Sequence, residues 1–257
     1  MLTEPLTAPA QPGTQLASLR RVAIVPALNE EGNIGRVIDE LRTFDPGLDI
    51  VVVSDGSSDR TAAVAAEHGA HVISLPFNLG IGGAVQTGFR YAWEGGYDLA
   101  VRVDGDGQHD PAQLGGVVAP VLAGEADIVV GSRFVGESAY RSSATRRIGI
   151  RVLARVVSAI ARQRVTDPTS GFQALNRKAI RLFAADLPHD YPEVEGMVMV
   201  IRHRLRLREV PVSMRARVHG RSSIGALASV YYMAKVLLAL FVGLFRRSVV
   251  PMDEAER

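Results

Sequence analysis

The sequence has no cysteine among its 257 residues. This absence excludes a disulfide framework, a thiolate nucleophile and a cysteine-ligated zinc site, and it suits a reducing cytoplasm. Aromatic residues make up only 6% of the chain, and no nucleic-acid-binding motif is present. Nucleic acid is therefore a weak candidate partner. No secretory signal is recognisable in residues 1–19, which are polar and proline-rich and are predicted to form a flexible arm.

Lysine is scarce, with only Lys178 and Lys235, but arginine is abundant and unevenly placed. Residues 1–132 carry seven Arg against seventeen Asp and Glu, a net charge of −10. Residues 133–247 carry nineteen Arg and two Lys against seven acids, a net charge of +14. An arginine-rich genome would explain the preference for Arg over Lys but not this segregation. An acidic half beside a basic half fits a metal site that faces an anionic partner, either phosphate or a lipid surface.

Short apolar segments rich in Val and Ile alternate with helical segments in the first half of the chain. Strands are predicted over 22–28, 50–54, 71–75, 99–104 and 128–131. Helices are predicted over 32–42, 59–68, 81–93 and 111–122. This alternation indicates an α/β fold with a mainly parallel, Rossmann-like sheet that helices cover on both faces.

The second half follows a different pattern, with a loop at 135–143 and a turn at 167–171. Helices are predicted over 145–162, 177–184 and 193–204, strands over 172–175 and 209–214, and a long apolar helix over 222–247. We therefore expect a catalytic domain over 20–221, a membrane-interface helix over 222–247 and a tail over 248–257.

The segment 101–109 ends a predicted strand with two closely spaced carboxylates, Asp104 and Asp106. Hard divalent cations such as Mg²⁺ and Mn²⁺ prefer oxygen ligands and keep positions for water or substrate phosphates. Gly105 and Gly107 leave the backbone free to approach a diphosphate. Asp-Gly pairs also mark ordinary turns, so these residues alone leave a metal site and an acidic turn equally open.

Other polar residues directly follow predicted strands. In parallel sheets the ligands bind beyond the carboxyl ends of the strands, which places Asn29, Glu30 and Asp55 on one rim with Asp104 and Asp106. Capping of the next helix would explain Asn29 equally well. The segment 78–84 is a glycine-rich entry to a helix, where unpaired backbone N–H groups favour anions.

Taken together, these motifs resemble glycosyltransferase family 2, the inverting enzymes of GT-A fold, and most of all its dolichyl-phosphate mannose synthase and polyprenyl-phosphate glycosyltransferase branch. The resemblance runs from residue 21 to about residue 247. It rests on motifs in series, at 24–30, 55–59, 78–80, 104–109, 131–133, 169–172 and 217–222.

The resemblance implies roles for individual residues. Donor contacts are implied for Pro26, Asn29, Glu30, Asp55, Asn78, Gly80, Asp104, Arg217 and Ser222. Metal and donor diphosphate are assigned to Asp104, Asp106 and Gln108, and Arg133, Arg147 and Arg217 match the family's phosphate-handling arginines. Three positions depart from the family pattern: Ser54 replaces a common Asp, Arg151 a small polar residue and Ser223 a common Lys. The first departure leaves the nucleobase open.

A phosphate acceptor is also supported by the residues themselves. Arg147 and Arg151 are four residues apart and share one face of the predicted helix. Guanidinium groups bind phosphate in a bidentate way. The alternative is that Arg147 or Arg151 is an ordinary arginine on a solvated helix face. A phosphomonoester, whose second pKa is about 6, needs no general base at pH 7. A sugar hydroxyl would need one, for which Asp167 is the candidate, although its ordinary role would be to open the turn before Pro168.

The closing helix is apolar for about twenty residues, nominally enough to span a bilayer. Lys235 lies at its centre, and burying that charge costs roughly 2.5–3.5 kcal/mol. We expect a helix in the membrane interface; docking on protein, an ordinary core helix and a spanning helix stay open. The resemblance implies peripheral attachment to the cytoplasmic membrane face, through such a helix or a small membrane subunit.

The leading prediction is thus a Mg²⁺- or Mn²⁺-dependent transferase that moves a hexose from a UDP- or GDP-sugar to polyprenyl phosphate. Catalysis is assigned to Asp104, Asp106, Arg133 and Arg147, and the acceptor phosphate site to Arg133, Arg147 and Arg151. Transfer to a sugar hydroxyl with Asp167 as base, and a non-catalytic nucleotide-sugar-binding regulator, are the alternatives. A nucleotidyltransferase is disfavoured because the expected N-terminal triphosphate loop is missing.

Overall fold

The computed structural model describes residues 19–136, 144–215 and 235–243, and the side chains of 144–147 are not among the described parts. Seven strands form one sheet in the order β3-β2-β1-β4-β6-β5-β7. The strand bounds are β1 Arg21–Ala27, β2 Asp49–Ser54, β3 His71–Ser74, β4 Leu99–Arg102, β5 Ile128–Ser132, β6 Gln173–Asn176 and β7 Leu207–Pro211. Among the strands that the structure describes, β6 alone runs antiparallel to its neighbours, and the predicted mainly parallel sheet is confirmed.

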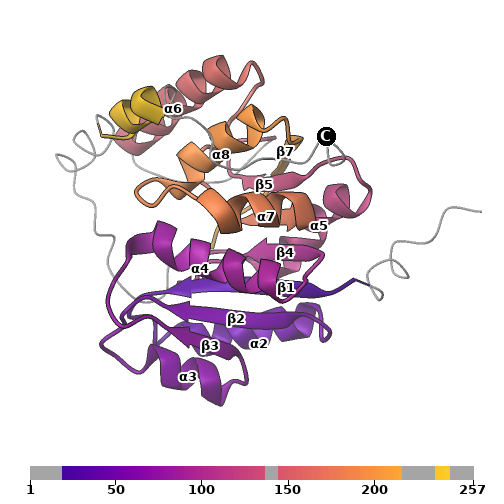
Figure 1. Ribbon diagram of the computed structural model, residues 1–257, viewed down its shortest axis with the longest axis vertical. Helices are drawn as coiled ribbons and strands as arrows, with labels where there is room; N and C mark the ends of the chain where they lie inside the picture. Colours follow the sequence, from indigo (N-terminus) through magenta and orange to yellow (C-terminus); the bar gives the residue numbers. More distant parts are fainter. Residues whose placement is uncertain (1–18, 137–143, 216–234, 244–257) are drawn as a thin grey trace, which may run out of the picture.

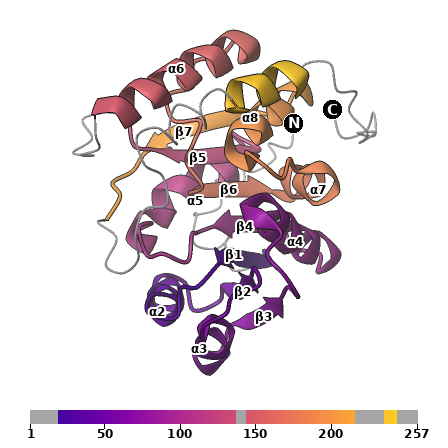
Figure 2. The same ribbon diagram turned by 90° about the vertical axis from the view of Figure 1, so that its left-hand side faces the viewer.

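Helices cover both faces of this sheet (Figures 1 and 2). Their bounds are α2 Ile34–Phe44, α3 Thr61–Glu67, α4 Gly80–Glu94, α5 Leu114–Leu122, α6 Ala144–Ala161, α7 Arg177–Asp186 and α8 Pro192–Arg202, with a 3₁₀ turn η1 at Pro111–Gln113. Residues 235–243 form a further helical segment. No helix among the described ranges is long and apolar enough to span a bilayer.

The core consists of two clusters, one on each face of the sheet. Along β1, Val22 and Ile24 enter the cluster under α4, α7 and α8, whereas Ala23 and Val25 enter the cluster under α2 and α5. Successive strand side chains point to opposite faces, so a strand buried on both sides must be apolar throughout. That requirement explains the continuous Val and Ile runs of the central strands.

Element boundaries differ from prediction mainly around β4. Its pairing with β6 ends at Arg102, two residues earlier than predicted, because the backbone beyond follows β1 alone through N–H bonds from Val103 to Ile24 and from Gly105 to Pro26. The helix predicted from residue 111 begins with η1, where Asp110 accepts a hydrogen bond from Ala112 and Pro111 occupies the first turn. β7 begins at Leu207 rather than at residue 209.

The predicted closing helix lies partly outside the described residues. Within 235–243, Val236 and Leu240 are buried in the same cluster as Leu153 and Val157 of α6. Figures 1 and 2 show this segment beside α6 and α8. One face of the segment is therefore docked on protein, while Leu238, Phe241 and Val242 on the opposite face are about 60% exposed.

Candidate active site

A pocket of about 290 Å³ opens at the carboxyl ends of β1, β2 and β4. These strands are parallel, so the residues that follow each of them meet at one edge of the sheet. The lining contains seven of the predicted site residues: Pro26, Glu30, Asp55, Asn78, Gly80, Asp104 and Asp106. Ala27, Leu28, Ile81, Ala84 and Gly105 complete it. The structure thus brings together residues that are up to eighty positions apart in the chain.

Of the described residues predicted to bind the donor or the metal, Asn29 and Gln108 do not line this pocket. Asn29 has a left-handed backbone (φ 54°), and its Oδ1 accepts hydrogen bonds from the backbone N and the hydroxyl of Ser58 at 2.8 and 3.2 Å. Gln108 donates its side-chain amide to the carbonyl of Arg215 at 3.4 Å. Asn29 therefore holds the loop after β2, and Gln108 joins the carboxylate loop to residue 215.

The glycine-rich entry to α4 is fixed by side chains at the pocket. Asp55, which is almost fully buried, accepts a hydrogen bond from the backbone N of Leu79 at 2.7 Å. Asn78 accepts one from the backbone N of Gly80 at 2.7 Å. Gly56 (φ +67°) permits this approach, because a Cβ there would lie 2.6 Å from the backbone N of Asn78. The backbone N–H groups of Leu79 and Gly80 therefore donate hydrogen bonds within the protein and are not available to an anion.

The carboxylate pair lies on a loop that its own backbone stabilises. Asp106 is buried and accepts a hydrogen bond from the backbone N of Gln108 at 3.0 Å, while the side chain of Asp104 keeps 33% of its surface exposed. The backbone N of Asp104 donates to Nδ1 of His109 at 3.0 Å, and Nε2 of that ring lies 3.7 Å from Oδ2 of Asp104. The ring stacks on Phe172 with centroids 4.8 Å apart.

Electrostatics keeps Asp104 in its charged form. Burial by itself would raise the pKa of Asp104, but the electrostatic interactions with His109 and Arg102 outweigh it and hold that pKa below the ordinary value. Burial, in turn, lowers the pKa of His109 against the attraction of Asp104 and Asp106. A neutral ring can accept the Asp104 N–H at Nδ1 and present an N–H at Nε2 toward the carboxylate.

Two further residues at Asp104, Arg102 and Glu193, were not predicted from the sequence. Arg102, at the end of β4, is 2% exposed, and its Nη2 lies 2.5 Å from Oε1 of Glu193 and 3.5 Å from Oδ1 of Asp104. A signal was present, since a lone arginine in the apolar segment 99–103 needs a buried partner. The partner was not visible, because Glu193 follows 91 residues later.

Arg133 and Asp167 form a buried pair beside this group. Nε and Nη2 of Arg133 donate to the two carboxylate oxygens of Asp167 at 2.6 and 2.7 Å, and Nη2 also donates to Thr169 at 2.7 Å. Asp167 is 0% exposed. The predicted candidate for a general base thus has both oxygens engaged and no access to solvent.

Glu209 of β7 closes this network. Its carboxylate accepts hydrogen bonds from the backbone N of Thr166 and of Asp167, both at 2.8 Å. Burial raises the pKa of Glu209, against the lowering effect of these hydrogen bonds. The start of the turn predicted at 167–171 is therefore held by Glu209 through its backbone and by Arg133 through the side chain of Asp167.

The remaining predicted residues lie on or beyond α6. Arg151 is exposed on that helix. Arg147 belongs to α6, but its side chain is outside the described parts of the structure, and Arg217 and Ser222 lie outside the described residues altogether. The arrangement of the basic residues around the acceptor stays a prediction.

The carboxylates of the pocket are suitable ligands for a divalent cation. No group of three His, Asp or Glu side chains with metal-site geometry occurs in the described part of the chain. Asp104 and Asp106 nevertheless line one pocket wall together. Mg²⁺ and Mn²⁺ are commonly held by one or two carboxylates, with substrate phosphates and water as the other ligands. The two carboxylates fit that pattern.

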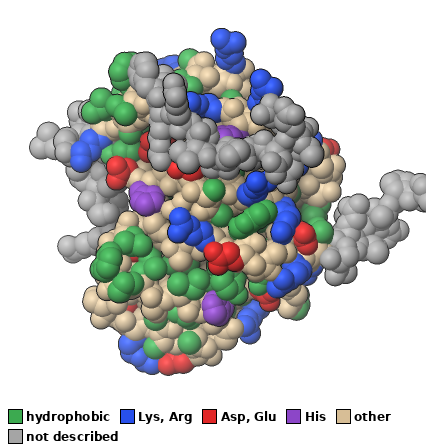
Figure 3. Space-filling view, in the orientation of Figure 1, with side chains coloured by type: hydrophobic (Ala, Val, Ile, Leu, Met, Phe, Trp, Pro, Cys, Tyr) green, Lys and Arg blue, Asp and Glu red, His purple; other side chains and the backbone are tan. Residues whose placement is uncertain are grey.

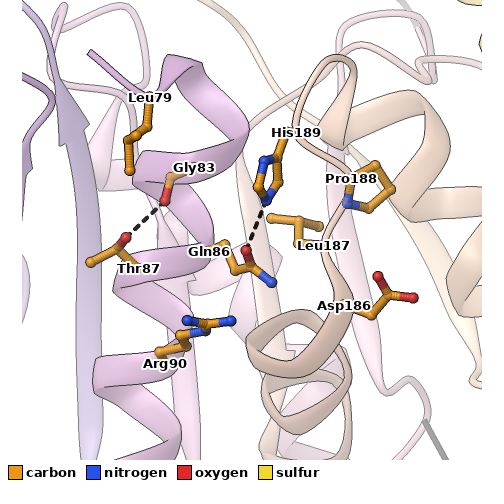
Figure 4. Close-up of a pocket in the computed structure, with 9 residues that line it drawn as sticks. All are labelled: Leu79, Gly83, Gln86, Thr87, Arg90, Asp186, Leu187, Pro188 and His189. Atoms are coloured by element: carbon orange, nitrogen blue, oxygen red, sulfur yellow. Dashed lines mark hydrogen bonds between the residues drawn. The ribbon is translucent and has the colours of Figure 1, made fainter. Parts of the chain in front are cut away.

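A second cavity, of about 530 Å³, lies between α4 and residues 186–189 (Figure 4). Oε1 of Gln86 accepts a hydrogen bond from Nε2 of His189 at 3.0 Å, and Thr87 donates to the carbonyl of Gly83 at 2.8 Å. Arg90 donates to the carbonyl of Ala184 at 3.2 Å. The polar side chains that line this cavity therefore form hydrogen bonds with other residues of α4 and of the segment 184–189.

Residues 22–183 match the sequence profile described as glycosyl transferase family 2. The chain belongs to glycosyl transferase family 2. The predicted family and the predicted enzyme class are thereby confirmed, and the carboxylate-lined pocket is the candidate active site of a glycosyltransferase.

Relatives from several organisms agree with the predicted branch of the family. The glycosyltransferase is 30% identical over 209 residues to the UDP-N-acetylglucosamine–dolichyl-phosphate N-acetylglucosaminyltransferase of Methanococcus voltae, covering 74% of this chain and 83% of the relative. It is 29% identical over 226 residues to the polyprenol monophosphomannose synthase of Mycolicibacterium smegmatis, covering 83% and 84%.

The GT-A fold has a solved counterpart in the glucosyl-3-phosphoglycerate synthase of Mycobacterium tuberculosis, crystallised with Mn²⁺, uridine diphosphate and glucosyl-3-phosphoglycerate. The TM-score is 0.70 and the identity 24%, with 97% of this chain and 88% of that chain covered. At this identity the likeness establishes the fold, which confirms the predicted architecture.

Proposed function

We propose that this glycosyltransferase moves a hexose from a UDP- or GDP-sugar to polyprenyl phosphate, with inversion at the anomeric carbon, at the cytoplasmic face of the membrane. The observation that carries the proposal is that Asp104 and Asp106 share one pocket with Pro26, Asp55 and the entry to α4. The names of the M. voltae and M. smegmatis relatives specify dolichyl phosphate and polyprenol monophosphomannose, which supports the choice of acceptor.

Asp104 and Asp106 would hold Mg²⁺ or Mn²⁺ together with the donor diphosphate. A divalent cation there supplies neutralisation of the negative charge that develops on the leaving nucleoside diphosphate. The Mn²⁺ and uridine diphosphate in the M. tuberculosis enzyme support this part of the proposal. Glu30, Asp55 and Asn78 form the wall on which the nucleoside would lie.

A phosphate acceptor explains why the site can work without a general base. Asp167 is engaged by Arg133 and is inaccessible to solvent. A phosphomonoester is mostly deprotonated at pH 7, so its oxygen is already the nucleophile. Its attack from the face opposite the leaving diphosphate inverts the anomeric carbon. Of the three arginines predicted for the acceptor phosphate, we keep Arg147 and Arg151. Arg133 is bonded to Asp167 and Thr169, and we assign to it the holding of the 166–170 turn beside Asp104.

The donor and the cation can be tested together by thermal shift. UDP- and GDP-sugars with Mn²⁺ should raise the Tm of the wild-type protein for one nucleotide series. Asp104→Asn should abolish the Mn²⁺-dependent part of the shift and lower kcat/KM by about 100-fold or more, because it removes transition-state charge stabilisation. The control is Asp98→Asn, because the carboxylate of Asp98 accepts a hydrogen bond from the backbone N of Arg20 and does not line the pocket.

The acceptor is tested by offering the radiolabelled donor to polyprenyl phosphate and, separately, to glycosides with free hydroxyl groups. We expect label in the lipid phosphate only, and the opposite anomeric configuration in the product by NMR. Transfer to the hydroxyl acceptors, or no stabilisation by any nucleotide sugar, would refute the proposal.

A further inference from the structure

We propose that Arg102, anchored by Glu193, is a positioning residue that orients the carboxylate of Asp104 toward the cation and donor diphosphate. This inference rests on the proposed metal-dependent transfer. Arg102 and Glu193 lie outside the sequence motifs that resemble those of the family.

The first support is the connection that Arg102 makes between two elements. Arg102 ends β4, which lies between β1 and β6 in the sheet. Its Nη2 lies 2.5 Å from Oε1 of Glu193, in the first turn of α8, and 3.5 Å from Oδ1 of Asp104. The stronger contact is with Glu193, so the guanidinium is fixed by α8 and presents its edge to Asp104.

The second support is that the surroundings leave Asp104 little freedom. A Cβ added to Gly171 would lie 3.0 Å from Nη2 of Arg102 and 3.1 Å from Oδ1 of Asp104, so the 169–171 turn packs directly on this contact. On the other side, His109 approaches Oδ2 of Asp104 at 3.7 Å. Both oxygens of one carboxylate therefore have a fixed neighbour.

The third support is the balance of charge. Burying an ion pair is costly, and apolar residues often stabilise a core equally well, so stability alone does not account for Arg102. Its Nε has no hydrogen-bond partner among the described residues. Glu193 offsets the charge of Arg102, so the negative charges of Asp104 and Asp106 stay available to a divalent cation. Without Glu193, the charge of Arg102 would act on Asp104 alone and compete with the cation.

The deciding experiment measures Mn²⁺ affinity from the EPR signal of free Mn²⁺, on the full chain with the nucleoside diphosphate that stabilises the wild type. Arg102→Met adds net negative charge, so electrostatics alone predicts tighter binding. Positioning predicts weaker binding, by roughly 10- to 100-fold, as for other residues that orient metal ligands. Glu193→Gln, which keeps an acceptor oxygen, should also weaken binding, and Arg102→Lys should fall between Arg102→Met and the wild type.

Asp45→Asn is the matched control, because Asp45 forms a partly buried pair with Arg21 at 2.8 Å away from the pocket. It should lower the urea midpoint without changing Mn²⁺ affinity. Unchanged or tighter binding by Arg102→Met would overturn the inference. If that variant does not fold, unchanged binding by Glu193→Gln and Arg102→Lys would overturn it in the same way. If the wild type binds no Mn²⁺, the result would instead contradict the metal-dependent transfer of the proposed function.

Discussion

Three arginines show how partners are chosen at the scale of single residues. Arg102 pairs with Glu193, Arg133 with Asp167 and Arg206 with Asp127, across sequence separations of 91, 34 and 79 residues. The phosphate-handling role predicted for Arg133 overlooked its carboxylate partner, because local sequence carries no signal for a partner so far away. The described side chains of Arg102 and Arg133 therefore serve to hold carboxylates and turns beside the pocket.

Asp127 provides a test of stability against pH. Burial by itself would raise the pKa of Asp127, but hydrogen bonds from Arg206 and Asn176 outweigh it and hold that pKa below its ordinary value of 3.8. A carboxyl whose pKa is lowered on folding stabilises the protein above the ordinary pKa, and this stability is lost as the pH falls through the folded value. Asp127→Asn should thus be less stable than the wild type at pH 7 and lose less stability on acidification.

The measurement is urea unfolding at pH 7 and at about pH 3. Asp39→Asn is the control, because the side chain of Asp39 is 59% exposed. Equal acid sensitivity of Asp127→Asn and the wild type would contradict the assignment.

At the scale of elements, two helical glycines should respond in opposite directions to the same substitution. A Cβ at Gly82 of α4 would lie 2.2 Å from the carbonyl oxygen of His189, so Gly82→Ala should force α4 away from residues 186–189 and cost about 1–3 kcal/mol. Gly116 of α5 has nothing within 4 Å of such a Cβ, and Gly116→Ala should stabilise by about 0.5–1 kcal/mol. Free energies of urea unfolding check both, and a stabilising Gly82→Ala would contradict the close approach of α4 to residues 186–189.

Most elements could be predicted because their signals are local. The apolar runs of β1, β2 and β5 and the periodic helices α4 and α7 were predicted within about two residues of their observed bounds. The end of β4 could not be, because the pairing with β6 stops at Arg102 while the apolar alternation continues to Val103. Strand ends depend on the neighbouring strand, which the local sequence does not contain.

At the scale of the whole molecule, the charge asymmetry and the layer formed by α6 and residues 235–243 lead to a prediction about membranes. Residues 144–164 contain six Arg and no acidic residue. Arg151, Arg155 and Ile148 are exposed on α6, and Leu238, Phe241 and Val242 on the neighbouring segment. Figure 3 shows hydrophobic side chains at the upper left, over the region of residues 235–243. Exposed apolar side chains beside arginines fit an anionic lipid surface.

Vesicles containing phosphatidylglycerol should therefore bind the wild type. The binding should weaken as salt is added, because salt screens the attraction between the arginines and the anionic lipid. The double variant Leu238→Ser, Phe241→Ser should weaken binding by at least about tenfold, since burying each such side chain is worth roughly 1.5–3 kcal/mol. Phe44→Ser is the control, because Phe44 is 40% exposed on α2, at the opposite end of the molecule (Figure 1). Co-sedimentation checks this, and equal loss in both variants would remove the surface from consideration.

The sequence by itself determined the order of strands and helices, the family and the rim that carries Asp104 and Asp106, because periodicity and strand-end motifs are local. Tertiary structure alone decided that Asp167 is closed off by Arg133, that Asn29 and Gln108 bond to neighbouring loops, and that Glu193 reaches Arg102. Those outcomes depend on which distant groups share a buried space, where every charge must find a partner, and that space exists only after the chain has folded.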